Sequence, residues 1–410
     1  MLTACLLHRF RGSGSALAVM LIGGLGLSAC GDAVRPTAPS TPGPEPRVLS
    51  FVSVTAGYDH SCGLTATGVA YCWGGNEEGQ LGDGTPAVPG AWSTVPKPVI
   101  GGLTFASVTA GAFHTCGVAT SGTAYCWGFN VAGQVGDGTK NKRNEPVPVT
   151  GGFSFTSVSA GGGHTCGVTT SAAAYCWGDL GEGRATNDRT TGSTVPMAVA
   201  GGLTFESIDV GGDHRCGTTD SGAAYCWGAG HDGRLGDGST VDRNSSPAAV
   251  AGGLAFAQVG AGATHTCGLS TSGTTYCWGF NGSGQLGIGS NGASYVPAEV
   301  VGGLSFVSLS TGDNHTCGVT TGGDAYCWGL NSYGQLGDGS RTNHHVPVPV
   351  ASGLTFESVS AGRSHACGVT TTGETYCWGR NDVGTLGDGT TIDRNVPVLV
   401  GGQTISAGTG

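Results

Sequence analysis

Charge is scarce in this sequence, and the charged residues do not gather into blocks. Lysine, arginine, aspartate and glutamate together make up 11% of the 410 residues. The 17 basic residues form no cluster, so the electrostatic footprint of a nucleic-acid-binding protein is missing. The 27 acidic residues form no run, and a hydrophobic share of 38% is too high for a disordered acidic chain. We therefore expect a folded protein that binds no nucleic acid.

Motifs that carry known chemistry are also missing. The sequence contains no Gly-x-Ser-x-Gly elbow, no His-Glu-x-x-His and no Walker sequence. It also lacks the Cys-x-x-Cys spacing that is typical of zinc sites. We therefore predict no catalytic residue, no metal ligand, no cofactor and no enzyme activity.

Glycine, in contrast, is abundant at 80 residues. The glycines follow no three-residue period and prolines number only 17, which excludes a collagen-like chain. Short strands joined by tight glycine turns fit this composition best.

The N-terminus is typical of an exported protein. Arg9 and Arg11 precede an apolar run over 16–27 that is too short to favour a spanning helix. The apolar run ends in the sequence Leu27-Ser28-Ala29-Cys30. These four residues resemble the bacterial lipobox, in which the cysteine is acylated and becomes the first mature residue. We therefore expect a lipoprotein signal peptide over 1–29 and an anchor at Cys30, with an ordinary cleaved signal as the alternative.

Residues 30–48 follow as the acylated cysteine and a proline-rich tether. Gly31 favours sorting to the outer membrane, by resemblance to sorted lipoproteins. We expect an exported protein that touches the membrane through its lipid anchor only, on the periplasmic face or the cell surface.

From residue 49 onward the chain repeats one unit seven times. The Tyr-Cys-Trp-Gly motif recurs with its cysteines at Cys72, Cys126, Cys176, Cys226, Cys277, Cys327 and Cys377. A period of about 50 residues is typical of propellers and solenoids. Each unit holds three short strand-like segments and a fourth that contains proline, which is confined to edge strands and should therefore be outermost.

We predict that the units close into a ring, an all-β seven-bladed β-propeller of four-stranded antiparallel blades over 49–410. A solenoid normally needs polar capping units, whereas the first and last units here are as apolar as the middle ones. The segment 403–408 mimics the opening strand of a unit, so it can complete a shared blade.

Three linked motifs recur: Ala-Gly-x-x-His-x-Cys-Gly, Tyr-Cys-Trp-Gly-x-Asn and Gly-Gln-Leu-Gly-Asp-Gly-Thr. Through them the chain resembles the regulator of chromosome condensation repeat family across essentially all of 49–410. The resemblance implies a seven-bladed propeller. The third unit departs from the pattern over 179–188.

Fourteen of the 16 cysteines come in pairs ten residues apart. Pairing Thr65 with Val69 in the first hairpin places Cys62 directly opposite Cys72, and outside the cytosol such pairs oxidise. The predicted disulfides join Cys62 to Cys72, Cys116 to Cys126, Cys166 to Cys176, Cys216 to Cys226, Cys267 to Cys277, Cys317 to Cys327 and Cys367 to Cys377. Buried free thiols and zinc sites are the alternatives.

One histidine precedes the first cysteine of every unit: His60, His114, His164, His214, His265, His315 and His365. Seven equivalent copies argue against a catalytic role, which needs one histidine with a unique partner. We expect inward imidazoles that satisfy backbone groups near the channel. A ring that binds a metal or senses pH is the alternative.

The Gly-Asp-Gly-Thr sequence, as at 82–85, offers one carboxylate per loop, too few for calcium. It predicts a tight turn with glycine at positive φ and an aspartate bonded to its own backbone. The tryptophans of the repeat should pack blade against blade, with a sugar-stacking platform as the alternative.

Function should lie where the repeats differ, between Gly-Asp-Gly and the proline strand. Those loops should crowd one side of the disc. The candidate binding residues there are Trp92, Arg143, Arg243, Arg341, His345 and Arg394. Solvated loops without a partner are the alternative.

We expect a monomeric interaction module for an unknown protein or a cell-envelope polymer. A second hypothesis, implied by the resemblance, is regulation of a small GTPase through nucleotide exchange, or inhibition of a secreted enzyme. A third is a lyase or glycosidase that uses the face of the propeller. It would need a unique close pair of acids, and the sequence offers none by spacing, so it would require a hydrolysis that is lost on mutating Asp188 or Glu182.

Overall fold

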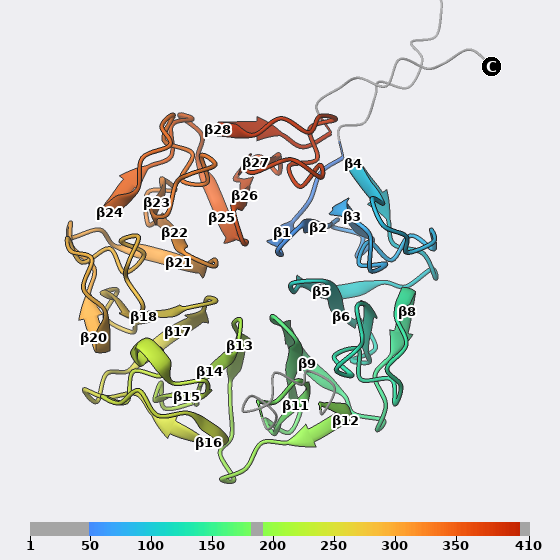
Figure 1. The fold of residues 1–410 in the computed structure, drawn as a ribbon, viewed down its shortest axis with the longest axis horizontal. Helices are drawn as coiled ribbons and strands as arrows, with labels where there is room; N and C mark the ends of the chain where they lie inside the picture. The colour runs from blue at the N-terminus through green and yellow to red at the C-terminus, as the bar shows by residue number, and fades with distance from the viewer. Residues whose placement is uncertain (1–48, 182–191, 402–410) are drawn as a thin grey trace, which may run out of the picture. The chain divides into compact units, whose positions relative to one another are not determined.

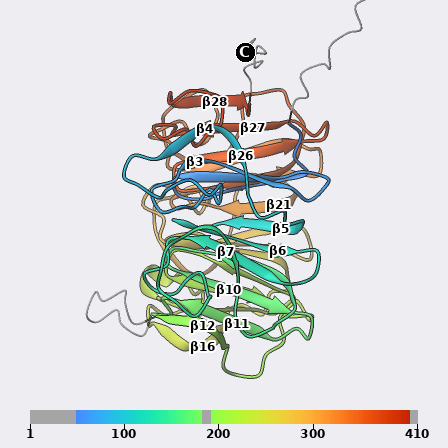
Figure 2. The ribbon, with the colours of Figure 1, turned by 90° about the vertical axis from the view of Figure 1, so that its right-hand side faces the viewer.

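The computed structural model describes residues 49–181 and 192–401, which form seven four-stranded antiparallel sheets arranged in a ring (Figure 1). Each sheet takes its four strands from one repeat, in chain order from the axis outward, and is here called a blade. The seven-bladed propeller predicted from the period and the motifs is therefore confirmed. The blades stack side by side around the axis, as the edge-on view in Figure 2 shows.

The blades are numbered 1 to 7 along the chain. Their strands are β1 (Ser53–Ala56), β2 (His60–Leu64), β3 (Ala70–Gly75) and β4 (Trp92–Pro98) in blade 1; β5 (Phe105–Ala110), β6 (His114–Ala119), β7 (Ala124–Gly128) and β8 (Arg143–Pro148) in blade 2; β9 (Phe155–Ala160), β10 (His164–Thr169), β11 (Ala174–Gly178) and β12 (Ser193–Ala198) in blade 3; β13 (Ser207–Val210), β14 (His214–Thr218), β15 (Ala224–Gly228) and β16 (Arg243–Ala249) in blade 4; β17 (Phe256–Ala261), β18 (His265–Ser270), β19 (Thr275–Gly279) and β20 (Ser294–Glu299) in blade 5; β21 (Phe306–Thr311), β22 (His315–Thr320), β23 (Ala325–Gly329) and β24 (His344–Pro349) in blade 6; and β25 (Phe356–Ala361), β26 (His365–Thr370), β27 (Thr375–Gly379) and β28 (Arg394–Leu399) in blade 7. Within the described residues one 3₁₀ turn, η2 (His231–Gly233), lies between β15 and β16.

The proline-bearing strand is the outermost strand of each blade, as predicted (Figure 1). In blade 1 all five residues of β2 are buried, whereas most of β4 is half-buried or exposed. Proline removes a ladder donor, and the outer edge of a sheet is where that loss is tolerated.

The same register brings the paired cysteines together. Cys62 lies opposite Cys72, and their Cα atoms are 4.0 Å apart. The Thr65 amide donates to the Val69 carbonyl at 3.0 Å, so strict alternation along the ladder makes 62 and 72 a non-hydrogen-bonded pair. Such pairs are the closely spaced ones, which explains why a disulfide spans the two strands here. The structure has the same seven pairs that the spacing predicts.

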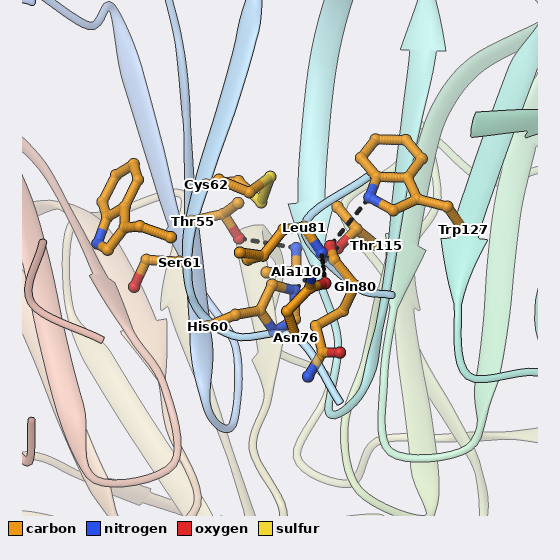
Figure 3. Close-up of a disulfide and its surroundings, with 12 residues drawn as sticks. Thr55, His60, Ser61, Cys62, Asn76, Gln80, Leu81, Ala110, Thr115 and Trp127 are labelled. Atoms are coloured by element: carbon orange, nitrogen blue, oxygen red, sulfur yellow. Dashed lines mark hydrogen bonds between the residues drawn. A yellow bond between two sulfur atoms is a disulfide. The ribbon is translucent and has the colours of Figure 1, made fainter. Parts of the chain in front are cut away.

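Each disulfide belongs to the core between two blades. The first packs with Leu81 of its own blade against Phe105 and Trp127 of blade 2. Figure 3 shows Leu81 and Trp127 near this disulfide. The Trp127 indole N–H donates to the Gln80 carbonyl at 2.9 Å, again across the junction. The predicted role of the tryptophans in packing blade against blade is therefore confirmed. Blades 7 and 1 meet in the same way, with Trp73 packed on Cys367 and Cys377.

A belt of backbone hydrogen bonds links all seven blades around the axis. In each Ala-Gly turn the residue after the glycine donates its N–H to the corresponding glycine carbonyl of the next blade. The last link runs from the Arg363 amide back to the Gly57 carbonyl at 3.0 Å, which closes the ring between blades 7 and 1. The overhang predicted over 403–408 lies outside the described residues.

The belt requires glycine because the blades approach so closely. A Cβ atom added at Gly211 would lie 2.1 Å from the Gly262 carbonyl oxygen, although Gly211 has an ordinary φ. We expect Gly211→Ala to lower the free energy of unfolding by about 2–3 kcal/mol, since blades 4 and 5 must separate locally. Denaturant unfolding of the oxidised protein measures the change. Gly292→Ala, at a site with open space, is the control; equal losses in both variants would contradict the steric argument.

Candidate functional site

Five of the seven repeated histidines bridge neighbouring blades through a side-chain hydroxyl. His60 Nε2 lies 2.8 Å from Thr115 Oγ1 of the next blade, and that hydroxyl donates to the Gln80 carbonyl at 2.7 Å (Figure 3). Because a hydroxyl has only one proton to give, the imidazole must be the donor, which assigns the Nε2–H tautomer. The partner is therefore a side-chain hydroxyl and not a backbone group, so this detail of the prediction was wrong.

The same bridge recurs around the ring, with the partners His114 and Thr165, His214 and Thr266, His265 and Thr316, and His365 and Ser61. Two junctions differ, because Arg215 and Ala366 stand where the hydroxyl should be. Burial lowers the pKa of His60 to about 3, so the imidazole is neutral at pH 7. Within 49–181 and 192–401, no group of three or more His, Cys, Asp or Glu side chains could hold a metal ion.

The Gly-Asp-Gly loops are tight turns, as predicted. Gly82 and Gly84 have φ values of 65° and 76°. The Asp83 carboxylate accepts from the backbone N–H of Thr85 at 3.1 Å, within its own loop. A Cβ at Gly82 would lie 2.6 Å from Trp127 Nε1, so the turn also seats the tryptophan of the next blade.

Three of the four predicted arginines, Arg143, Arg243 and Arg394, open outer strands, and each pairs with an aspartate of its own blade. Arg143 Nε donates to the Asp137 carboxylate at 2.6 Å. Arg243 and Arg394 contact Asp237 and Asp388 in the same way. Each pair joins an outer strand to the Gly-Asp-Gly turn of its own blade, so these cations are held at the blade rim. Their role in binding stays a prediction.

The other predicted binding residues differ in exposure. Trp92 opens β4 and is 52% exposed. The Arg341 side chain is 53% exposed, with Asp393 at 3.6 Å. His345 in β24 is half-buried beside its neighbour His344, whose imidazole contacts Asp338 at 2.9 Å. The acids Glu182 and Asp188 lie outside the described residues.

One face of the propeller gathers two of the four connections of each blade. Since consecutive strands are antiparallel, the loop from the first to the second strand and the loop from the third to the fourth emerge on the same side. We call this side the loop face, and the opposite side, with the β2–β3 type hairpins, the hairpin face. The variable stretches and the Ala-Gly belt both belong to the loop face.

A pocket of about 440 Å³ opens on the loop face, lined by residues of blades 7, 1, 2 and 3. Its size falls in the range of small ligand sites. Its walls include the rings of Phe113 and Phe129, whose centroids lie 6.4 Å apart, and the carboxylates of Asp59, Glu77 and Asp179. We call this cavity the loop-face pocket.

The pocket lies where blade 3 has glycine at both positions before its histidine, whereas every other blade carries at least one side chain there. Gly162 and Gly163 line it. At the corresponding place in blade 6, Asp313 and Asn314 fill the space, and Asn314 Oδ1 accepts from Gln285 Nε2 at 3.2 Å. The equivalent of Gln285 beside the glycines is Gln134, and it has no such acceptor.

Gln134 is fully buried and lines the loop-face pocket. Its Oε1 accepts from the Ala132 N–H at 3.0 Å, which fixes the orientation of the amide. Its Nε2 group has no hydrogen-bond partner among the described residues. A buried donor without a partner lowers the stability of the fold by about 1–3 kcal/mol. An acceptor that enters the pocket and bonds to Nε2 would remove this cost.

Aromatic and acidic groups continue along the loop face next to the pocket. Tyr58 contacts Phe113 edge to face, and Arg363 lies over the Tyr58 ring at 5.6 Å. Burial raises the pKa of the Asp313 carboxyl to about 7. Burial also raises the pKa of Asp59, against the opposing charges of Arg363 and Arg380.

The central channel holds a second pocket, of about 400 Å³, walled by the inner strands. In six of the seven inner strands one position points a polar group at the next blade, and blade 5 has Gly260 there; for example, Thr55 Oγ1 accepts from the Ala110 N–H at 3.1 Å (Figure 3). Blade 4 has Asp209 there, and its carboxylate accepts from Ser159 Oγ at 2.8 Å and from the Ala261 N–H at 2.9 Å. These groups are satisfied within the protein, so they hold neighbouring blades together.

Sequence reasoning identified the variable loops after Gly-Asp-Gly but missed the pocket. The residues that line it occupy variable positions inside the recurrent motifs, such as Glu77 beside Asn76 and Gly163 beside His164. The available signal was the departure of single units from the repeat.

No helix in the described part of the chain is both long and apolar enough to cross a membrane.

Comparisons with known proteins agree with the fold. The model of the RCC1-like domain matches residues 155–410, and models of the regulator of chromosome condensation (RCC1) repeat match 51–80 with 105–134 and 67–118 with 121–168. The solved structure of Prp20p from Saccharomyces cerevisiae superposes with a TM-score of 0.72 at 20% identity, covering 87% of this chain and 88% of that one.

Curated relatives match shorter parts of the chain. The human probable E3 ubiquitin-protein ligase HERC4 is 36% identical over 98 residues, which are 24% of this chain and 9% of that protein. Human RCC1 domain-containing protein 1 is 37% identical over 87 residues, 21% of this chain and 22% of that protein. The matches therefore span a tenth to a fifth of the relatives' own length.

Proposed function

This chain belongs to the RCC1 repeat family, and we propose that it is a lipid-anchored scaffold that binds a protein or cell-envelope polymer through its loop face. The observation that carries this proposal is the contrast between the two parts of each repeat. The histidines, tryptophans, glycines and disulfides are engaged in holding blades together. The side chains that differ between units gather on the loop face, around a pocket of ligand size.

The proposed scaffold has no catalytic role. Relatives such as HERC4 carry the word ligase in their names, but the shared part is a small fraction of each protein. The propeller alone is what this chain shares with them. We therefore assign it binding and not ligation.

Export and anchoring complete the proposal. The lipobox-like sequence ending at Cys30, followed by the proline-rich stretch to residue 48, supports a tether that holds the propeller off the outer membrane. Both segments lie outside the described residues. The seven disulfides support an oxidising compartment, since such bonds rarely persist in the cytosol.

Site-specific photo-crosslinking in cells tests the proposal. A photoreactive residue replaces Trp92 or Arg341 on the loop face, and Asp324 on the hairpin face as the control. We expect discrete adducts from the first two positions and none from the third, in the membrane fraction. A Cys30→Ser variant should leave that fraction. Adducts from Asp324 alone, or from no position, would contradict the scaffold.

The alternative from the family resemblance is regulation of a small GTPase or inhibition of a secreted enzyme. The same fractionation separates these hypotheses from the scaffold. A cytosolic chain with free thiols would favour GTPase regulation, because such GTPases lie in the cytosol. An exported chain whose adduct is a soluble secreted enzyme would favour inhibition.

A further inference from the structure

We propose that the loop-face pocket binds a lysine or arginine side chain of a partner polypeptide, together with a backbone carbonyl next to it. The inference rests on the proposed scaffold function and names the chemistry of its partner. Its evidence is a pocket of about 440 Å³ whose walls combine carboxylates, aromatic rings and one buried amide donor without a partner among the described residues.

The charges in the pocket select a cation. Asp59, Glu77 and Asp179 line it, and the positive side chain in its wall, Arg380, lies 3.8 Å from Asp59 and 2.5 Å from Asp382. The Glu77 carboxylate accepts from the Gly90 N–H at 2.7 Å, which holds it in place. The formal net charge of the chain is −10, so the long-range field also attracts a cation.

The aromatic walls suit the same ligand. Phe113 and Phe129 line the pocket with their rings at 75° to each other. The face of an aromatic ring attracts an ammonium or a guanidinium, and desolvation in a pocket strengthens that attraction. The apolar stem of a lysine or arginine side chain can lie against these rings while its head reaches the carboxylates.

The amide of Gln134 distinguishes a polypeptide from a simple polyamine. Its oxygen is engaged by the Ala132 N–H, so its Nε2 group can only donate. A polyamine has no acceptor to offer, whereas each peptide unit carries a carbonyl. In blade 5 the equivalent Gln285 donates to Asn314 of the next blade, and the two glycines of blade 3 leave the corresponding space to the ligand.

Binding of a defined peptide tests the inference. The probe is fluorescently labelled tetralysine, acetylated and amidated at its ends so that only its side chains are charged, and it is titrated into the oxidised propeller at low salt. We expect Asp59→Asn combined with Asp179→Asn to weaken binding by about tenfold or more. The matched control is Asp220→Asn combined with Asp324→Asn, two exposed acids of the hairpin face, which should leave affinity within about twofold.

A second variant separates the peptide from a polyamine. Gln134→Leu should weaken tetralysine and leave spermine unchanged, because only the peptide offers a carbonyl to Nε2. Thermal unfolding of every variant shows that it is folded.

An equal loss of tetralysine affinity in the hairpin-face control, or no loss of affinity in the pocket variant, would overturn the proposal. If crosslinks form at Trp92 and Arg341 while tetralysine fails to bind, the scaffold stands and this inference fails; if no crosslinks form, the scaffold itself fails.

Discussion

Reducing the seven disulfides should unfold the propeller under conditions in which the oxidised protein is fully folded. Each bond closes a loop between residues ten apart. In the chain-entropy model such a bond contributes about 2–3 kcal/mol, so the seven together amount to about 14–21 kcal/mol, which equals or exceeds the whole stability of a typical domain. The bonds lie inside the cores between blades, and the sulfurs of Cys62 and Cys72 are fully buried.

Burial of the sulfurs dictates how the measurement is made. A reductant cannot reach them in the folded ring, so the protein is reduced in denaturant and returned to native buffer with reductant present. Circular dichroism and tryptophan fluorescence then report folding. Replacing one pair, Cys216→Ala with Cys226→Ala, should cost about 2–5 kcal/mol and leave a folded ring. A reduced chain that refolds with an unchanged denaturation midpoint would show that the disulfides are dispensable.

Much of the fold could be predicted from the sequence because the repeat constrains it locally. The 50-residue period, the proline strand and the cysteine spacing each depend on residues within one unit. The pairing of Thr65 with Val69 fixes the register of its hairpin, and the register fixes the disulfide. Local geometry was enough for these features.

Contacts between blades were harder to predict, since they join residues about 50 apart. The bridge from His60 to Thr115 needs the geometry of the junction, although a signal was present. A serine or threonine follows the histidine in five of the seven units, and Arg215 and Ala366 are the exceptions. Similarly, Arg143 follows Asp137 by six residues, a spacing that blades 4 and 7 repeat with their own ion pairs.

The loop-face pocket shows why a site on a repeat protein is hard to read from one unit. It results from what is missing at Gly162 and Gly163, and from what neighbouring blades place around that gap. No spacing rule within a unit reports a missing side chain. Comparison of the seven units position by position would have found Gln134 without its acceptor, provided that the ring and its junctions were already known.

Acid should unfold the propeller steeply below about pH 6. The buried imidazoles of His60, His114, His265 and His365 have their pKa lowered to about 3, chiefly by burial. Burial likewise lowers the pKa of His315 to about 4, and that of His214 well below its ordinary value. In the unfolded chain these groups titrate near pH 6.5.

The difference in proton uptake between the unfolded and the folded chain decides whether acid stabilises or destabilises the propeller. Between about pH 6.5 and pH 4 the unfolded chain binds protons on these six histidines and the folded ring does not, so stability is complete above this window and is lost as the pH falls through it. The carboxyl of Asp313, whose pKa burial raises to about 7, is protonated in the folded state and opposes one histidine. Burial also raises the pKa of Asp209 and of Asp59, so these two carboxyls oppose the histidines in the same direction. The net uptake is therefore about three to five protons, which corresponds to a loss of about 4–7 kcal/mol for each unit of pH at 1.36 kcal/mol for each proton.

Such a slope predicts a sharp midpoint near pH 5, which denaturant titrations at several pH values would locate. The disulfides do not titrate, so the acid transition should occur with all seven bonds intact and reverse on neutralisation.

Removing one buried imidazole provides the internal check. His315 has no partner for Nε2 in the described residues, so His315→Leu breaks no bridge and should lower proton uptake on unfolding by about one. A stability that stays flat from pH 7 to pH 5 would show that the histidines are already solvated in the folded ring, and the cross-blade bridges would then have to be abandoned.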